Sequence, residues 1–439
     1  MLTQACKADK RGGKAMNEER ALAILRSAMA EMMANDVHSH LDPRAPAAGS
    51  LADILLYHFV TTELLTAGAP AESLNRKLPA EERLERCLPY FPLIANTATW
   101  WCVRRLMADL YDLDFAILDR RRLKAGWDAV ARRRRDRHWP RYVLVERARI
   151  CKTLAMAQHR PHPAFRRYDF LFPHWEALYF GPRNFSRAYF HRGAEIPRWE
   201  DFIGGWEDRL IAAARYGNVG YAGHLDSSFR RIDAPESDLR RFYEKMRRGA
   251  VMAPDEQNAL STRLLRETLV AIGKSGRPLQ LFTGARWPVF SKPPHFVAKS
   301  LAVPRQALAV DLAELLQEYP DSRVNLLCCT PAMSHELVVA CRMCPNLNLT
   351  GFWWHVMFHR HIEDLIAERV DMLPANKWLL VATDAYNVEW SYAKIAIVKE
   401  ALARVLARRV AEGRLAIFQA LFLAERVLFI NAREVYGFL

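Results

Sequence analysis

The sequence lacks any long uncharged apolar run. A membrane-spanning helix needs about 20 consecutive apolar residues, and the best candidate, 415–430, is interrupted by Glu425 and Arg426. The first twenty residues contain no apolar segment of the kind that secretory signals carry. We therefore expect a cytoplasmic protein that neither crosses nor binds a membrane.

Cysteine is also scarce. Eight cysteines are spread unevenly over 439 residues, which does not fit the disulfide framework of a small secreted domain. Cys341 and Cys344 have the spacing of half a zinc knuckle, but no second pair follows. Ordinary buried thiols are therefore expected. Walker A and GxGxxG motifs are absent as well, so no nucleotide cofactor is predicted.

The composition is that of a globular protein, with 51% hydrophobic and 26% charged residues. The net charge of +14 is concentrated partly in two arginine-rich stretches, 120–122 and 131–137. Basic patches can bind nucleic acid, but no RNP, zinc-finger or helix-turn-helix signature accompanies the charge. A solvated helix face is the preferred interpretation, and no nucleic-acid partner is expected.

Hydrophobic periodicity divides the chain into four parts. Residues 1–35 form an extension and an amphipathic helix over 17–34 with Asn17 as its cap, and 36–44 form a strand and its loop. Residues 45–140 are helical in pattern. From 141 to 439 strands and helices alternate, which predicts a parallel sheet with crossover helices. The expected helices include 254–273 and 393–411.

Counting the strand at Val37, the sequence shows eight strand candidates, the number of strands in a TIM (β/α)8 barrel. The other seven are 151–156, 170–172, 219–222, 279–282, 324–328, 347–351 and 379–382. The predicted fold is therefore an α/β TIM (β/α)8-type barrel with a large helical insertion after the first strand.

Two histidines mark the end of the first strand. His38 and His40 are two residues apart, so their side chains point to the same side of a strand. In a parallel barrel the carboxyl ends of the strands form the catalytic face. Imidazole is a common ligand of zinc and related metals, so these two residues are candidate metal ligands.

An aspartate marks the end of the last strand. The buried run 379–382 leads into Thr383 and Asp384, and closure of a barrel would bring Asp384 beside the first strand. Asp384 could then complete a His–His–Asp site or act as an acid or base. The alternative is that Asp384 caps the following helix.

A third histidine cluster contains His355, His359 and His361. The first two are four residues apart, a spacing that can bind metal on one helix face. No HExxH glutamate is present, so a zincin is excluded. Surface or packing histidines are the preferred interpretation.

Taken together, VHSHLD at 37–42, TDA at 383–385 and NAREVYG at 431–437 resemble motifs of the amidohydrolase superfamily. Within it the sequence is most similar to the uronate isomerases, which share the long helical insertion. The strand QLFTGARW at 280–287 and the tryptophan pair Trp353 and Trp354 also resemble that family. The resemblance covers the chain from about residue 17.

The resemblance implies one divalent metal ion, zinc or manganese, held by His38, His40 and Asp384. It implies a sugar acid as small-molecule substrate, aldose–ketose isomerisation by proton transfer between C1 and C2, and possible homo-oligomers. It assigns catalysis and substrate binding to one set of residues: Asp384, Arg286, His174, Trp353, Trp354, His355, Tyr386 and His58.

Three positions depart from the family pattern. Phe282 replaces a histidine, Tyr386 replaces an arginine, and Glu176 stands where an arginine is expected. A uronate carboxylate favours a guanidinium partner, and Arg286, His58 or His174 would have to compensate. The alternatives are a hydrolase or decarboxylase of the same superfamily, and a degenerate barrel that is kept for binding.

Overall fold

The computed structural model describes residues 16–157, 162–181, 195–286, 301–352 and 356–437, with the backbone alone at 176 and 177. Trp353, Trp354 and His355 lie outside the described residues. Within the described ranges, no helix is long and apolar enough to cross a membrane.

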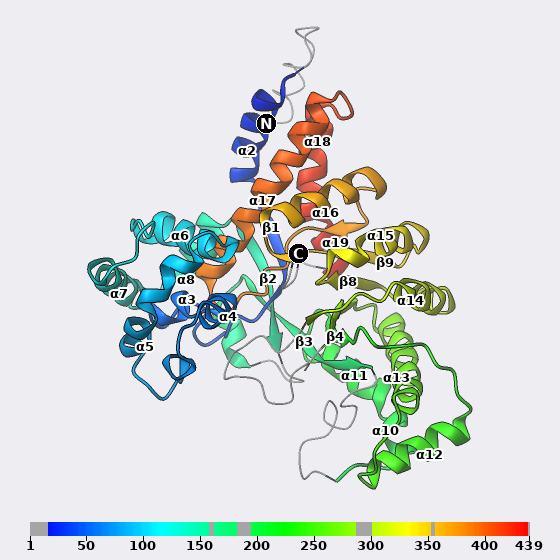
Figure 1. The fold of residues 1–439 in the computed structure, drawn as a ribbon. Coiled ribbons are helices and arrows are strands. Elements are labelled where there is room, and N and C mark those ends of the chain that lie inside the picture. Colours follow the sequence, from blue (N-terminus) through cyan, green and yellow to red (C-terminus); the bar gives the residue numbers. More distant parts are fainter. Residues whose placement is uncertain (1–15, 158–161, 182–194, 287–300, 353–355, 438–439) are drawn as a thin grey trace.

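The core of the molecule is a parallel sheet of eight strands in the order β1-β2-β3-β4-β5-β8-β9-β10 (Figure 1). Neighbours in the sheet are therefore successive main strands of the chain. Their bounds are β1 Ala34–Ser39, β2 Ile150–Ala157, β3 Leu171–Phe180, β4 Tyr221–Leu225, β5 Leu279–Thr283, β8 Val324–Cys328, β9 Leu347–Thr350 and β10 Trp378–Leu379. All eight predicted strands are present.

The sheet closes between its first and last strands. The backbone N–H of Val37 donates to Val381 O at 3.0 Å, Asp384 N–H donates to His38 O at 2.8 Å, and His40 N–H donates to Ala385 O at 2.7 Å. Backbone hydrogen bonds thus join β1 to the segment that follows β10. The predicted barrel is confirmed, and its closure is what brings the two ends of the sequence together.

Helices cover the outside of the barrel from β4 onward, as the alternating pattern predicts. They are α12 Glu236–Arg247, α13 Pro254–Ser275, α14 Ala307–Glu318, α15 Ser334–Met343, α16 His359–Met372, α17 Val388–Ala411, α18 Ile417–Glu425 and α19 Asn431–Tyr436, with α10 Trp199–Gly204 and α11 Trp206–Arg215 between β3 and β4. Short helical turns η4 Pro163–Arg167, η5 Pro331–Met333 and η7 Arg426–Ile430 and the hairpin β6 Ala285–Arg286 with β7 Leu301–Ala302 complete this part.

The predicted helical insertion lies between β1 and β2 and gathers on one side of the barrel (Figure 1). It comprises α3 Ala52–Leu55, α4 His58–Thr66, η1 Ala71–Leu74, α5 Ala80–Cys87, η2 Leu88–Ile94, α6 Ala98–Tyr111, α7 Arg120–Arg134, α8 Trp139–Arg141 and η3 Tyr142–Arg147. A buried carboxylate ties it to the barrel, because Glu389 on α17 accepts hydrogen bonds from Tyr111, Trp139 and the Ala48 N–H.

Several element boundaries differ from the sequence prediction, and the two largest differences are at α17 and β3. Helix α17 begins at Val388 rather than 393, because Asn387 caps it by accepting from Trp390 N–H at 3.0 Å. Strand β3 runs on to Phe180, well beyond 172, because its neighbours β2 and β4 supply backbone partners that a local pattern does not reveal. The first helix, α2 Glu18–Glu31, is capped by Asn17 as predicted and packs against α17 and α18.

The interior of the barrel has its own apolar cluster, separate from the larger core under the helices. Val37, Leu154, Ala222, Phe282 and Leu327 contribute to it from five strands. Helix α19 closes the amino end of the barrel, where the Tyr436 hydroxyl accepts hydrogen bonds from Gln280 and Asn325 at 3.1 and 3.2 Å. Helix α19, which ends at Gly437, therefore plugs the barrel.

Candidate metal centre

Three predicted metal ligands converge at the carboxyl end of the barrel. His38 lies in β1, His40 follows it, and Asp384 follows the last strand. One carboxylate oxygen of Asp384, Oδ1, is 3.5 Å from His38 Nε2 and 3.1 Å from His40 Nε2. One ligand atom from each residue lies within 4.8 Å of the other two. His38 and Asp384 are buried, whereas His40 is partly exposed.

The backbone of Asp384 is held in an unusual conformation. Its φ is +51°, in the left-handed region that non-glycine residues rarely adopt. Hydrogen bonds fix it from both sides: its N–H donates to His38 O, and its carbonyl accepts from Tyr57 Oη at 3.1 Å and Lys394 Nζ at 3.2 Å. Strain of this kind persists where the surroundings over-determine it. The alternative role of Asp384 as a helix cap is wrong, since Asn387 is the cap of α17.

A second carboxylate, that of Asp36, holds the candidate ligands in place through hydrogen bonds. Asp36 is completely buried in β1 and accepts from the N–H and hydroxyl of Thr383, at 2.8 and 2.6 Å, and from Thr153 Oγ1 at 3.0 Å. It also accepts from the His38 N–H at 3.3 Å. Asp36 thereby links the residue before Asp384 to the backbone of His38, which fixes the spacing of the two ligands.

The electrostatics keep Asp384 ionised. Burial alone would raise the pKa of Asp384, but hydrogen bonds from His38 and His40, the charge of His40 and the charge of Lys394 outweigh burial and hold the pKa well below its usual value. Burial lowers the pKa of Lys394, while the charge of Asp384 raises it. Burial, reinforced by the charge of Asp384, raises the pKa of Tyr57 well above its usual value.

Aromatic rings surround the cluster. The Tyr386 ring stacks on His40 with centroids 4.7 Å apart, and the His58 ring lies 6.3 Å from Tyr386. Phe282 packs against His38 at 4.5 Å. The structure therefore brings two residues from the predicted substrate set, Tyr386 and His58, to the same wall as His40. Phe282, whose ring cannot ligate a metal, lies directly against His38.

His174 and Arg286 occupy different depths. The His174 ring is buried inside the barrel, 6.4 Å from His38 and 6.0 Å from Tyr436 of the plug helix. Arg286 lies beyond the carboxyl end of β5, in the β6–β7 hairpin, and within the described chain its buried Nε has no hydrogen-bond partner. The side chain of Glu176 lies outside the described part, and its backbone pairs with Ala222 of β4.

His355 lies outside the described residues, so the prediction that it shares a helix face with His359 stays a prediction. Helix α16 begins at His359, and Phe358 before it is extended, with φ −147° and ψ 155°. His359 meets the edge of the Trp101 ring at 4.7 Å. A spacing of four residues indicates a shared face only where one continuous helix contains both positions.

Sequence reasoning did not identify Tyr57, Lys394 and Asp36. Lys394 had a usable signal, because it is the one charged residue in the apolar run 392–398. In the structure it is only 6% exposed, which is unusual for a lysine. Asp36 directly precedes the VHSH motif, and a buried acid at the start of such a motif is a second candidate signal. For Tyr57 no local signal exists, since its role depends on how α4 approaches Asp384.

The residues fit a divalent cation. Two imidazole nitrogens and one carboxylate oxygen are donors that zinc and manganese accept, and three protein ligands leave positions for substrate, as in catalytic sites. The negative charge of Asp384 would offset part of the metal charge. The chain therefore has the donor set, the burial and the geometry for one such ion.

The fold and the cluster define a class: a closed (β/α)8 barrel with a His–His–Asp group at its carboxyl end and a helical insertion after the first strand. Comparison with family models finds no match, and comparison with curated proteins finds no significant match. Solved structures do match over nearly the whole chain.

The similar structures include uronate and glucuronate isomerases and a metal-dependent hydrolase. Glucuronate isomerase from Caulobacter crescentus matches with a TM-score of 0.82 at 15% identity, covering 97% of this chain and 95% of that one. Uronate isomerase from Bacillus halodurans matches with 0.76 at 18% identity, covering 97% and 98%. A putative metal-dependent hydrolase from Lactobacillus casei matches with 0.57 at 11% identity, covering 94% and 97%. At these identities the comparisons establish the fold, and the resemblance to uronate isomerases inferred from the sequence holds at that level.

Proposed function

We propose that the protein is a metal-dependent isomerase that interconverts the aldose and ketose forms of a sugar acid. The observation that carries the proposal is the convergence of His38, His40 and Asp384 on one point at the carboxyl end of a closed barrel. The fold shared with uronate isomerases supports the substrate class. A divalent ion bound there would polarise the carbonyl and the adjacent hydroxyl of the substrate.

In this proposal Asp384 moves the proton. Its carboxylate is ionised, so it can accept the proton from C2 of the aldose and return a proton to C1, while the hydroxyl proton passes from O2 to O1. The hydrogen bonds at its backbone hold the carboxylate in place between the two steps. Tyr386 and His58 would form the wall beside the substrate, and Arg286 would bind its carboxylate.

The departures from the family pattern bear on the substrate. Phe282 and Tyr386 supply neither the imidazole nor the guanidinium that the family pattern has. With Glu176 in place of arginine, we expect slow or absent turnover of D-glucuronate, and a different sugar acid as the better substrate. Glu176→Arg should then raise turnover of D-glucuronate. A rate of about 1 s⁻¹ or more for the unchanged protein, within the range of ordinary enzymes, would contradict this expectation.

The test combines metal analysis with a substrate screen. The purified protein is loaded with zinc or manganese, its metal content is measured, and ketose formation is followed with a panel of uronates and related acids. Asp384→Asn should abolish turnover while the fold, followed by circular dichroism, is retained. A matched control is Asp364→Asn on the outer helix α16, where Asp364 pairs only with a surface arginine among the described residues.

A hydrolase is the second candidate, favoured by the similarity of fold to the metal-dependent hydrolase. It predicts cleavage of an ester, amide or lactone by metal-loaded protein and no ketose from any sugar acid. A barrel that binds no metal under any loading condition would contradict both candidates and would favour a binding role.

A further inference from the structure

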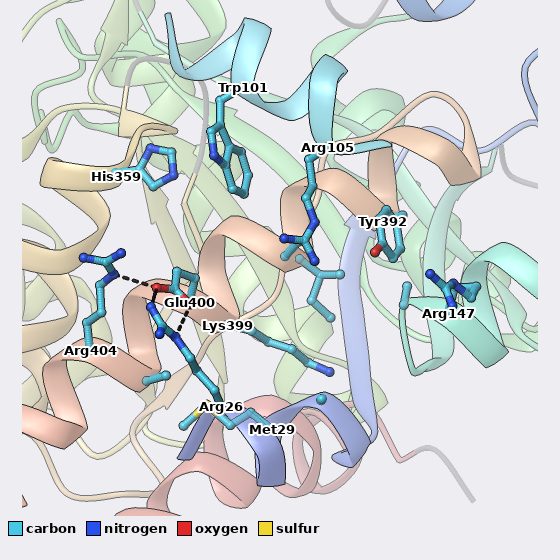
Figure 2. A pocket seen from close by; sticks show the side chains of 15 residues that line it. Arg26, Met29, Trp101, Arg105, Arg147, His359, Tyr392, Lys399, Glu400 and Arg404 are labelled. Atoms are coloured by element: carbon cyan, nitrogen blue, oxygen red, sulfur yellow. Dashed lines mark hydrogen bonds and ion pairs between the residues drawn. The ribbon is translucent and has the colours of Figure 1, made fainter. Parts of the chain in front are cut away.

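A cavity lies outside the barrel, between α2, α6, α16, α17 and η3. Figure 2 shows side chains from all five elements pointing into it. Its volume is about 560 Å³, within the range of about 300–1,000 Å³ that small-molecule sites occupy. Its lining includes neither the metal cluster nor the rings around it, so it is separate from the candidate active site.

The cavity is strongly basic. One carboxylate, Glu400, lines it together with five cationic side chains, so the formal charge of the lining is +4. The five cations are Arg26, Arg105, Arg147, Lys399 and Arg404. Glu400 accepts hydrogen bonds from Arg26 and from Arg404 at 2.9 and 2.7 Å. Asp109, behind the wall, binds Arg105 and the Tyr392 hydroxyl. Counting Asp109 and also Glu363, whose carboxylate lies 3.9 Å from Arg404 Nε, five cations face three carboxylates and the excess is +2.

Two of the five cations have no carboxylate partner among the described residues. Arg147 donates to the carbonyl of Asp109 at 3.2 Å, and Lys399 donates to the carbonyl of Met32 at 3.0 Å. A carbonyl oxygen satisfies a donor but does not neutralise its charge. Burial, together with the charge of Arg149, lowers the pKa of Lys399 to about 8, and the opposing charge of Glu31 does not offset this shift.

The opposite wall of the cavity is aromatic. Trp101 projects from α6 and meets His359 of α16 edge to face, with ring centroids 4.7 Å apart (Figure 2). Burial lowers the pKa of His359, so its ring favours the neutral form. A cationic floor beside an uncharged ring wall is suited to a molecule with a strongly anionic group at one end and an organic body at the other.

We propose that this cavity binds a small organic phosphate. A phosphoryl group carries a charge of about −1.5 to −2 near neutral pH and several acceptor oxygens, which matches the excess charge and the number of arginine and lysine donors better than a single carboxylate does. Guanidinium groups bind phosphate through paired hydrogen bonds. The phosphate would lie against Arg147 and Lys399, and the body of the ligand would lie along Trp101.

The test uses glucose 6-phosphate and adenosine monophosphate as probes, with glucose and adenosine as uncharged controls. Isothermal titration of the full chain should show binding of at least one phosphate and no binding of its uncharged control. Arg147→Gln should weaken that binding tenfold or more, and this variant is expected to fold because Arg147 is exposed. Arg408→Gln, an exposed arginine on α17 that does not line the cavity, is the matched control and should bind as the unchanged protein does.

A second pair of variants separates this site from the metal centre. His38→Ala with His40→Ala should leave phosphate binding unchanged, whereas Lys399→Met should weaken it. Equal affinity of the unchanged protein and Arg147→Gln would overturn the proposal, as would loss of binding in the double histidine variant. If neither phosphate binds, the proposal is overturned too. The same holds if a second copy of the chain covers the cavity and prevents binding.

Discussion

The two ends of the barrel contain different kinds of polar residues, although the same strands build both. At the amino end the side chains are neutral amides and a phenol, and Asn348 donates to Asn325, which in turn donates to Tyr436. At the carboxyl end they are ionisable, and two imidazoles face one carboxylate. Neutral groups that bind one another stabilise the fold, while charged groups gathered at one point favour a ligand.

The comparison predicts that metal binding depends only on the carboxyl end. Replacing both His38 and His40 by alanine should reduce the metal content from about one ion per chain to none, because a single carboxylate is a weak site. Metal analysis after dialysis measures the effect. His335→Ala with His361→Ala is the control with two histidines removed elsewhere, and it should keep the metal. Retention of the ion in the first variant would show that the site assignment is wrong.

The amino end should affect stability instead. Tyr436→Phe removes two buried hydrogen bonds, from Gln280 and Asn325, and should lower the free energy of unfolding by about 2 kcal/mol, at about 1 kcal/mol for each bond. Chemical denaturation provides the measurement, with Tyr319→Phe on the half-buried end of α14 as control. Metal content should not change. If Tyr436→Phe lost its metal and kept its stability, the proposed difference between the two ends of the barrel would be wrong.

A smaller effect is expected for a residue that supports the ligands without being one. Thr383→Val removes the hydroxyl that donates to the buried Asp36 at 2.6 Å. Loss of such outer partners lowers metal affinity by about 10–100-fold, and we expect the lower limit because Asp36 keeps its bonds to Thr153 and to the Thr383 N–H. Competition with a chelator measures the affinity. Thr350→Val, also buried at the carboxyl end, is the control and should bind metal normally.

The smallest expected effect is a change in how stability depends on pH. It concerns Glu389, the buried carboxylate between the helical insertion and the barrel. Burial raises the pKa of Glu389, although hydrogen bonds from Trp139 and the Ala48 N–H oppose the shift. A raised pKa in the folded state means that this group stabilises the fold at pH values below its unfolded pKa, and the contribution is lost as the pH rises through the folded value.

In the unchanged protein the free energy of unfolding should therefore decline as the pH rises above about 4.5, the ordinary pKa of glutamate. In Glu389→Gln this decline should be smaller, because the glutamine side chain does not ionise. Denaturation at a series of pH values measures this decline in metal-free protein. The exposed Glu85→Gln should leave the profile unchanged. Parallel profiles for Glu389→Gln and the unchanged protein would contradict the assignment of the pKa shift.

The sequence by itself determined the strands and helices of the barrel and the two segments that carry the candidate metal ligands. Alternation of apolar strands with amphipathic helices depends on local periodicity, so all eight strands and the helical insertion could be predicted. The spacing of His38 and His40 likewise fixes their common direction within one strand. These features depend on neighbours in the chain.

Only the tertiary structure decided how these two segments come together. Asp384 lies beside His38 because β1 bonds to the segment after the last strand, across more than 340 residues of sequence. Tyr57, Lys394 and Asp36 take their roles from that approach, and the cation-lined cavity requires α2, α6 and α17 to pack together. Contacts between distant segments depend on packing and closure, which local periodicity does not encode.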